Sequence, residues 1–303
     1  MSEIYRSAGI SCRSTHVNNE VLVISVSIRP NPNLDAPGWL SRVCQRDGYS
    51  ALDILNARRL DFPREEVSTL LPTVYNFAKN YKKVLIYGHS IAAYAALNFA
   101  PFVGAKIAVA ASPLFSPDPA KVPFERRWQT ERRLPKGFAW DNMVQSLNNL
   151  DHAYLLYDPH DDDDHHVKAI LEVSPSVTLI KIPFGGHPVS TVLAVNGNIF
   201  KLIADIAHDR FNPKIFRSII RESQRQSPRY FETLAKKQPR IRDELRVRLL
   251  EKGLQFQHSA TPSYLKKLIP PLIRQGRVRE AKDYADLAVI AGAARADVDK
   301  LLL

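Results

Sequence analysis

The sequence predicts an α/β fold in which a mostly parallel sheet carries helices on both faces and an all-helical region follows at the C-terminus. Three observations lead to this prediction. From about residue 20, short apolar runs alternate with stretches of helical periodicity, which is the pattern of repeated βα units. One of these runs turns abruptly into an alanine-rich helical segment at residues 88–92. After residue 208 the β-forming runs end, and helical segments punctuated by proline and glycine follow.

Six segments are expected to form buried parallel strands because they are short, apolar and rich in β-branched or aromatic residues. They are residues 21–28, 49–55, 83–88, 106–112, 153–158 and 177–183. Crossover helices are expected near residues 37–46, 64–80, 91–100, 141–150, 163–173 and 189–207. Residues 113–140 interrupt this order with five prolines and four arginines, so they are expected to form an inserted lid or loop. We interpret these arginines as exposed charges, with contact to an anionic substrate as the alternative.

The length of 303 residues allows one large domain with a smaller appendage. We expect an α/β domain at 1–208 and a basic helical extension at 209–303. The first part contains 21 Lys and Arg against 20 Asp and Glu, and the second contains 21 against 11. Residues 276–292, GRVREAKDYADLAVIAG, faintly resemble the second half of a tetratricopeptide unit, in which small residues let two helices pack closely. Because only one such half is visible, a simple helical hairpin is preferred.

The composition disfavours several classes of protein. Hydrophobic residues make up 45% and charged residues 24%, which is ordinary for a globular protein. The sequence contains neither a signal peptide nor an apolar run long enough to span a membrane, so a cytoplasmic protein is expected. Cys12 and Cys44 lack the spacing of a metal site or a disulfide framework and are interpreted as thiols. The basic charge of residues 209–303 is interpreted as a solvated helical face, with a protein partner as the alternative. Nucleic-acid binding is disfavoured because no binding module is recognisable.

The strongest chemical signal is KKVLIYGHSIAAYAALNFA, in which an apolar strand turns into a helix at Ser90. A serine at such a turn has a strained backbone, so the residues two before and two after it must be small, as Gly88 and Ala92 are. The helix N-terminus offers free N–H groups and a dipole that favours developing negative charge. The pattern therefore predicts a serine nucleophile, with the Ile91 N–H as an oxyanion donor. The alternative is an ordinary serine N-cap.

These residues resemble the nucleophile elbow, G-x-S-x-G, of the α/β-hydrolase superfamily, with Ala92 at the position of the second glycine. In that superfamily an acid and then a histidine follow the serine along the chain. The resemblance implies that the acid lies in the loop after residues 153–158, where the sequence reads PHDDDDHH. Asp161 has the most familiar offset, while Asp158 and Asp164 remain alternatives.

The resemblance also implies a histidine after the last strand, where the sequence reads FGGHP and His187 follows two glycines. His187 would act as the general base that accepts the proton of Ser90, and an acyl-enzyme would form and then be hydrolysed. The resemblance further implies a second oxyanion donor from the backbone of Ile28 or Arg29. Pro30, which follows them, has no N–H to donate.

The implied function is that of a serine hydrolase acting on a carboxylic ester or thioester of a small molecule or saccharide. No cofactor is expected. No metal is expected either, because the Asp and His run at 158–166 does not reproduce a known ligand spacing. An acyltransferase using the same serine is one alternative. A non-catalytic scaffold that binds a partner through residues 209–303 is the other.

Overall fold

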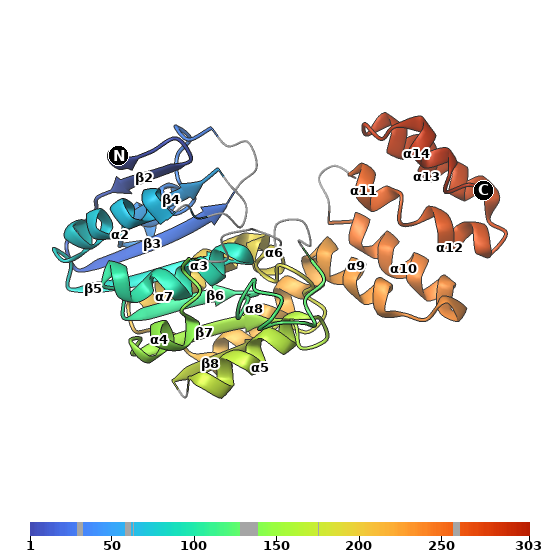
Figure 1. Ribbon diagram of the computed structural model, residues 1–303. Helices are drawn as coiled ribbons and strands as arrows, with labels where there is room; N and C mark the ends of the chain where they lie inside the picture. The colour runs from blue at the N-terminus through green and yellow to red at the C-terminus, as the bar shows by residue number, and fades with distance from the viewer. Residues whose placement is uncertain (29–32, 58–61, 63, 128–138, 175, 257–260) are drawn as a thin grey trace.

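An eight-stranded sheet lies at the centre of the first two thirds of the chain, in the order β1-β2-β4-β3-β5-β6-β7-β8 (Figure 1). The computed structural model describes residues 1–28, 33–57, 62, 64–127, 139–174, 176–256 and 261–303. The strands are β1 (Ser2–Arg6), β2 (Ile10–Thr15), β3 (Val21–Ile28), β4 (Ser50–Asn56), β5 (Lys83–His89), β6 (Ile107–Ala111), β7 (His152–Tyr157) and β8 (Val177–Lys181). Strands β3 to β8 pair in parallel, and β1 and β2 pair antiparallel at one edge.

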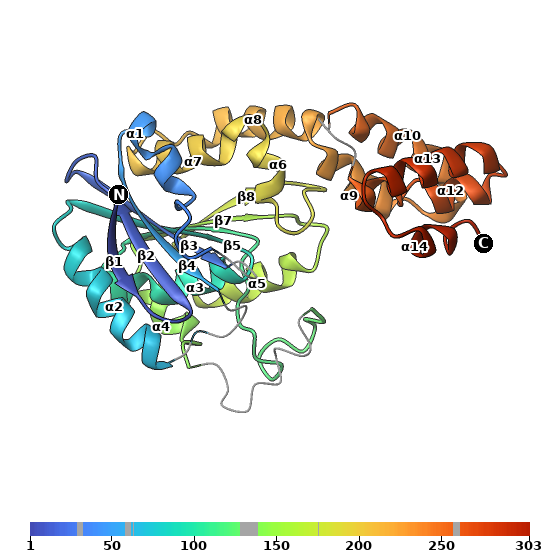
Figure 2. The ribbon, with the colours of Figure 1, turned by 90° about the horizontal axis from the view of Figure 1, so that it is seen from above.

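Helices cover both faces of this sheet, which confirms the predicted fold class (Figure 2). One face carries α2 (Arg64–Ala78), α3 (Ile91–Phe99), α4 (Met143–Asn148) and α5 (Asp163–Val173). The other carries α1 (Cys44–Asp47), α6 (Ser190–Ala194), α7 (Asn198–Ala207) and α8 (Pro213–Gln226). All six predicted strands are present to within two residues at each end. The edge hairpin of β1 and β2 was not predicted.

Two predicted helices are broken in the structure. The segment expected at 37–46 contains a 3₁₀ turn, η1 (Leu40–Arg42), followed by the single turn α1. The helix expected at 189–207 is divided into α6, η4 (Val195–Gly197) and α7, because Asn196 and Gly197 have φ of 58° and 68°. Positive φ angles are incompatible with a continuous right-handed helix.

The rest of the chain is helical, as expected. It forms α9 (Pro228–Lys237), η5 (Arg240–Arg242), α10 (Asp243–Leu254), α11 (Pro262–Leu265), α12 (Ile269–Arg274), α13 (Val278–Ile290) and α14 (Arg295–Asp299). Asn212 caps α8 by accepting the N–H groups of Lys214 and Ile215, and Pro213 occupies the first turn, where its missing N–H costs nothing. Within the described ranges, no helix has the length and apolar character of a membrane span.

Helix α8 lies beyond the predicted boundary at residue 208 but packs with the helices that precede it. Phe216 and Ile220 of α8 are buried in the same core as α6 and α7. Helices α9 to α14 share a separate core, to which α13 contributes Ala281, Ala285 and Ala288. We therefore propose a division between α8 and α9. The packed alanines fit a close helix pair, but the structure does not establish a tetratricopeptide unit.

Candidate active site

Ser90 occupies the sharp turn between β5 and α3. Its φ and ψ are 56° and −129°, a region that is costly for a residue with a side chain. The turn is held by the Ser90 N–H, which donates to the Ala111 carbonyl of the neighbouring strand at 2.8 Å. The Ser90 side chain does not cap α3. The alternative of an ordinary N-cap serine is therefore not what the structure shows.

Gly88 is required by the close approach of the elbow to α3. A Cβ atom at Gly88 would lie 2.2 Å from the Ala92 carbonyl oxygen, well inside van der Waals contact. The Cβ position is fixed by the backbone and the Ala92 carbonyl belongs to it, so neither group can rotate away. The sequence argument for a small residue at this position thus has a direct steric cause.

Gly88→Ala is expected to lower the free energy of unfolding by about 3 kcal/mol, as overpacking of a rigid backbone does. Gly276→Ala is the matched control, because Gly276 has a φ of +72° with nothing within 4 Å of its would-be Cβ. It should lose only about 1 kcal/mol, from backbone strain. Urea unfolding of both variants measures the difference, and equal losses would contradict the steric explanation.

His187 meets Ser90 from the loop after β8. Its Nε2 lies 2.6 Å from the Ser90 Oγ, so the structure brings together the predicted nucleophile and base. Asp158, one of the three acids considered, organises this loop instead of contacting the histidine. Its fully buried carboxylate accepts the N–H groups of Phe184 at 3.0 Å and Gly186 at 2.9 Å. Asp158 is thus a positioning residue for the loop.

The acid at His187 is Asp163, which corrects the assignment of Asp161. The Asp163 Oδ2 and Oδ1 lie 2.8 and 3.0 Å from the His187 Nδ1. Asp161 instead accepts the N–H of Asp162, and Asp164 forms an ion pair with Lys168. Asp163 is the first residue of α5, and the helix geometry there turns its side chain inward.

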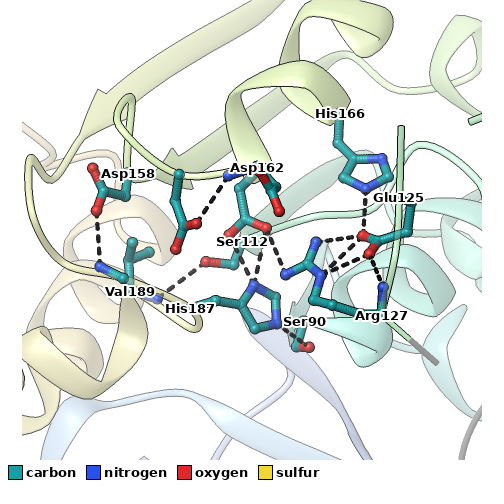
Figure 3. A network of polar contacts seen from close by, with 12 residues as sticks. Ser90, Ser112, Glu125, Arg127, Asp158, Asp162, His166, His187 and Val189 are labelled. Atoms are coloured by element: carbon teal, nitrogen blue, oxygen red, sulfur yellow. Dashed lines mark hydrogen bonds and ion pairs between the residues drawn. The ribbon is translucent and has the colours of Figure 1, made fainter. Parts of the chain in front are cut away.

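Arg127 of the insert links this carboxylate to Glu125 and His166 in a network of polar contacts (Figure 3). Arg127 donates to Asp163 Oδ1 at 3.0 Å and holds Glu125 through its Nε and Nη2. Glu125 also accepts from His166 Nε2 at 2.9 Å, while His166 Nδ1 accepts the N–H of Phe115. The interpretation of the insert arginines as exposed charges is therefore wrong for Arg127, which lies against the carboxylate of Asp163.

The pKa values of both buried carboxyls reflect this network. Burial raises the pKa of Asp163, but hydrogen bonding and charge at His187, together with the charge of Arg127, outweigh it and hold the pKa below its ordinary value. Burial also raises the pKa of Glu125, but hydrogen bonds from His166 and Arg127 outweigh this effect. The pKa of Glu125 is therefore lowered as well. Both groups are therefore carboxylates at neutral pH.

Acid is expected to destabilise the fold through these two groups. Since their pKa values are lower in the folded protein, the unfolded chain takes up protons first as the pH falls. Their stabilisation is complete above the ordinary carboxyl pKa of about 4 and is lost as the pH falls through the lowered values. Urea unfolding from about pH 6 to about pH 3 should show this loss, and Glu125→Gln should flatten it. The exposed control Asp151→Asn should leave the slope unchanged, and an unchanged slope in Glu125→Gln would contradict the assignment.

Comparisons with known proteins support the architecture. No family model matches the chain, and no curated protein matches its sequence. Est1E from Butyrivibrio proteoclasticus matches with a TM-score of 0.50 and 11% identity, over 69% of this chain and 98% of that one. The Glycosylation Associate Protein (Gap123) complex from Streptococcus agalactiae matches with a TM-score of 0.50 and 12% identity, and 65% of this chain spans only 44% of the matched chain. MGS-MChE2, an alpha/beta hydrolase enzyme from a sediment metagenome, matches at 14% identity with a TM-score of 0.44, over 69% and 99% of the two chains. With this strand order and the match to Est1E, the chain has an α/β-hydrolase fold. Other matched structures, with TM-scores from 0.43 to 0.49, include esterases, a lipase and an O-acetyltransferase.

The two predicted oxyanion donors lie, along the chain, at the start of α3 and at or after the end of β3. The Ile91 N–H is the first of α3, and the first N–H groups of a helix have no acceptor within the helix. It is therefore available to a ligand next to Ser90. The second predicted donor, Arg29, lies outside the described residues, whereas the alternative, Ile28, ends β3.

The helical extension of this α/β-hydrolase fold contacts the histidine loop directly. Arg229 of α9 donates from Nη2 to the His187 carbonyl oxygen at 2.6 Å, and its Nη1 pairs with Glu232. Lys237 of the same helix donates to the carbonyl of His160, in the loop that precedes α5. No sequence pattern indicated these contacts, because they depend on how α9 packs.

Proposed function

We propose that the chain is a serine hydrolase that cleaves a carboxylic ester or thioester through an acyl-enzyme on Ser90. One observation carries this proposal. Ser90, His187 and Asp163 form an unbroken hydrogen-bonded series, with 2.6 Å from Oγ to Nε2 and 2.8 Å from Nδ1 to Oδ2. A nucleophile, a base and an orienting acid in this order are the requirements for activating a serine.

In the proposed reaction, the Ser90 Oγ attacks the carbonyl carbon of the substrate while its proton passes to His187 Nε2. The Nδ1–H donates to Asp163, whose negative charge stabilises the imidazolium. The Ile91 N–H would donate to the oxyanion of the tetrahedral intermediate. His187 then protonates the leaving group, the C–O or C–S bond breaks, and an acyl-Ser90 remains. Water, deprotonated by His187, releases the acid and restores the serine.

A second candidate is acyl transfer to an alcohol, for which a cleft lined in part by His187 offers room. The cleft has a volume of about 480 Å³, and its lining includes His187 and Pro188 together with Thr261 and Ser263 of the helical extension. An alcohol bound there would replace water in the second half of the reaction. With an ester substrate and a polyol present together, the ratio of transesterified to hydrolysed product distinguishes the two candidates.

The test of the proposed function is labelling with a fluorophosphonate, read by intact mass. This probe reacts with activated serines whatever the natural substrate is. One adduct is expected on the unmodified chain and on Ser218→Ala, which removes an exposed hydroxyl on α8, and none is expected on Ser90→Ala. Absence of any adduct on folded protein would overturn the proposal in favour of the non-catalytic scaffold.

A further inference from the structure

A second cavity lies wholly within the helical extension. It is lined by residues of α9, α10, α12, α14 and the turns around them, and it has a volume of about 620 Å³. Part of its lining is apolar and comprises Ala235, Leu250, Pro270, Pro271 and Leu301. Volumes of this size are typical of sites for small organic ligands. None of the residues of the proposed active site lines it.

The polar lining of this cavity is strongly cationic. Seven of the lining residues are Lys or Arg, and two are acidic. Four of the seven make no ion pair with the acidic residues that the structure describes; these are Lys236, Arg240, Lys266 and Lys300. Like charges that gather around a concave apolar surface raise the local positive potential. The cavity is therefore suited to an anion.

The remaining three cations are held in place by acidic neighbours. Arg246 and Arg274 both pair with Asp243, at 3.2 and 2.5 Å, and Lys267 pairs with Glu232 at 3.0 Å. These pairs neutralise part of the charge of the cavity wall. The four unpaired cations are the groups left to meet a ligand.

We propose that this cavity binds an amphiphile with a phosphate monoester, with the phosphate at the unpaired lysines and the apolar part against the apolar lining. A phosphate monoester carries a charge of about −1.5 to −2 at neutral pH and three acceptor oxygens, so it suits several cations around one cavity better than a carboxylate does. An alkyl or acyl group of the same ligand would bury the apolar lining. The proposal goes beyond the hydrolase function and does not depend on it.

The test is calorimetric titration of the full chain with octyl phosphate, below the concentration at which it forms micelles. Octyl glucoside, which has the same chain and no charge, and inorganic phosphate serve as comparison ligands. Octyl phosphate should bind more tightly than either, because only it has both a phosphate for the cations and an alkyl chain for the apolar lining. Equal binding of octyl glucoside, or no binding of octyl phosphate, would overturn the proposal.

Two substitutions locate the site. Lys236 and Lys300 are both exposed, so Lys236→Glu with Lys300→Glu should leave the fold intact, which circular dichroism checks. This double variant should bind octyl phosphate about tenfold more weakly, or worse, because charge-assisted hydrogen bonds are lost. Lys282→Glu with Arg279→Glu makes the same change of charge on α13, where both side chains are exposed and outside the cavity lining, and should leave binding unchanged. Equal weakening in both variants would overturn the proposal in favour of non-specific attraction.

Co-sedimentation with vesicles distinguishes the two sources of such a phosphate. Phosphatidylcholine vesicles with and without phosphatidic acid present the phosphate monoester in a membrane. Recruitment only to the phosphatidic acid vesicles, lost in the Lys236→Glu, Lys300→Glu variant, would identify a lipid headgroup as the ligand. Binding of octyl phosphate without recruitment would identify a soluble ligand of the same chemistry.

Discussion

Ser90→Ala is expected to lower kcat for cleavage of an activated ester by about 10⁴- to 10⁶-fold. The hydroxyl at this position is the only group at the elbow that can form the proposed acyl bond, and it already lies 2.6 Å from the His187 Nε2. The backbone of the elbow is held by the Ser90 N–H and by Gly88, not by the hydroxyl, so the variant should fold. Release of p-nitrophenol from p-nitrophenyl acetate measures the effect.

The double variant Ser90→Ala, His187→Ala makes this prediction sharper. Residues that act as a unit show losses that do not add, so the double variant should be about as slow as Ser90→Ala alone. Ser218→Ala, on the exposed face of α8, should retain the full rate. Additive losses, or a rate that survives in Ser90→Ala, would show that the ester is cleaved elsewhere on the protein.

The parts of the fold that the sequence predicts well depend on local pattern. The six parallel strands are apolar because both faces of the sheet are covered by helices, and such runs stand out from the helices between them. The elbow is equally local, because the steric requirement at Gly88 concerns residues only four positions apart. The β1–β2 hairpin was missed because it is a partly exposed edge with polar residues in both strands. Its sequence therefore lacks an apolar run.

The parts that the sequence cannot predict depend on tertiary contacts. Arg127 lies in a segment rich in proline and arginine, and nothing local indicates that it reaches Asp163, 36 residues later. Helix α8 packs against the sheet through Phe216 and Ile220. Their spacing shows that one face of the helix is buried, but not whether it is buried against the sheet or against the helices that follow. The acid was misassigned for a related reason. In a run of four aspartates, the one that faces His187 is decided by where α5 begins, and that start cannot be located to one residue from sequence.

Asp163→Asn is expected to lower kcat by about 10⁴-fold, whereas Asp161→Asn should change it by less than about twofold. Asp163 is fully buried and lies 2.8 Å from the His187 Nδ1, where only a carboxylate both accepts the Nδ1–H and stabilises the imidazolium. An asparagine amide that donates to Nδ1 would place the ring proton on Nε2, so that the base could no longer accept from Ser90. Steady-state hydrolysis of the same ester compares the two variants.

Asp163→Asn could also lose activity because it disturbs the packing of the insert through Arg127. A comparison with Glu125→Gln tests this explanation. Arg127 keeps its bidentate pairing with Glu125 when Asp163 becomes neutral, so the insert should stay in place and the thermal unfolding temperature should fall only modestly. Glu125→Gln disturbs the same network without touching His187, since Glu125 contacts Arg127 and His166. If the Asp163 carboxylate orients His187 directly, Asp163→Asn should hydrolyse the ester far more slowly than Glu125→Gln at a temperature where both variants are folded. Comparable losses in both variants, or a large loss in Asp161→Asn, would mean that the network positions the loop and that another group orients the base.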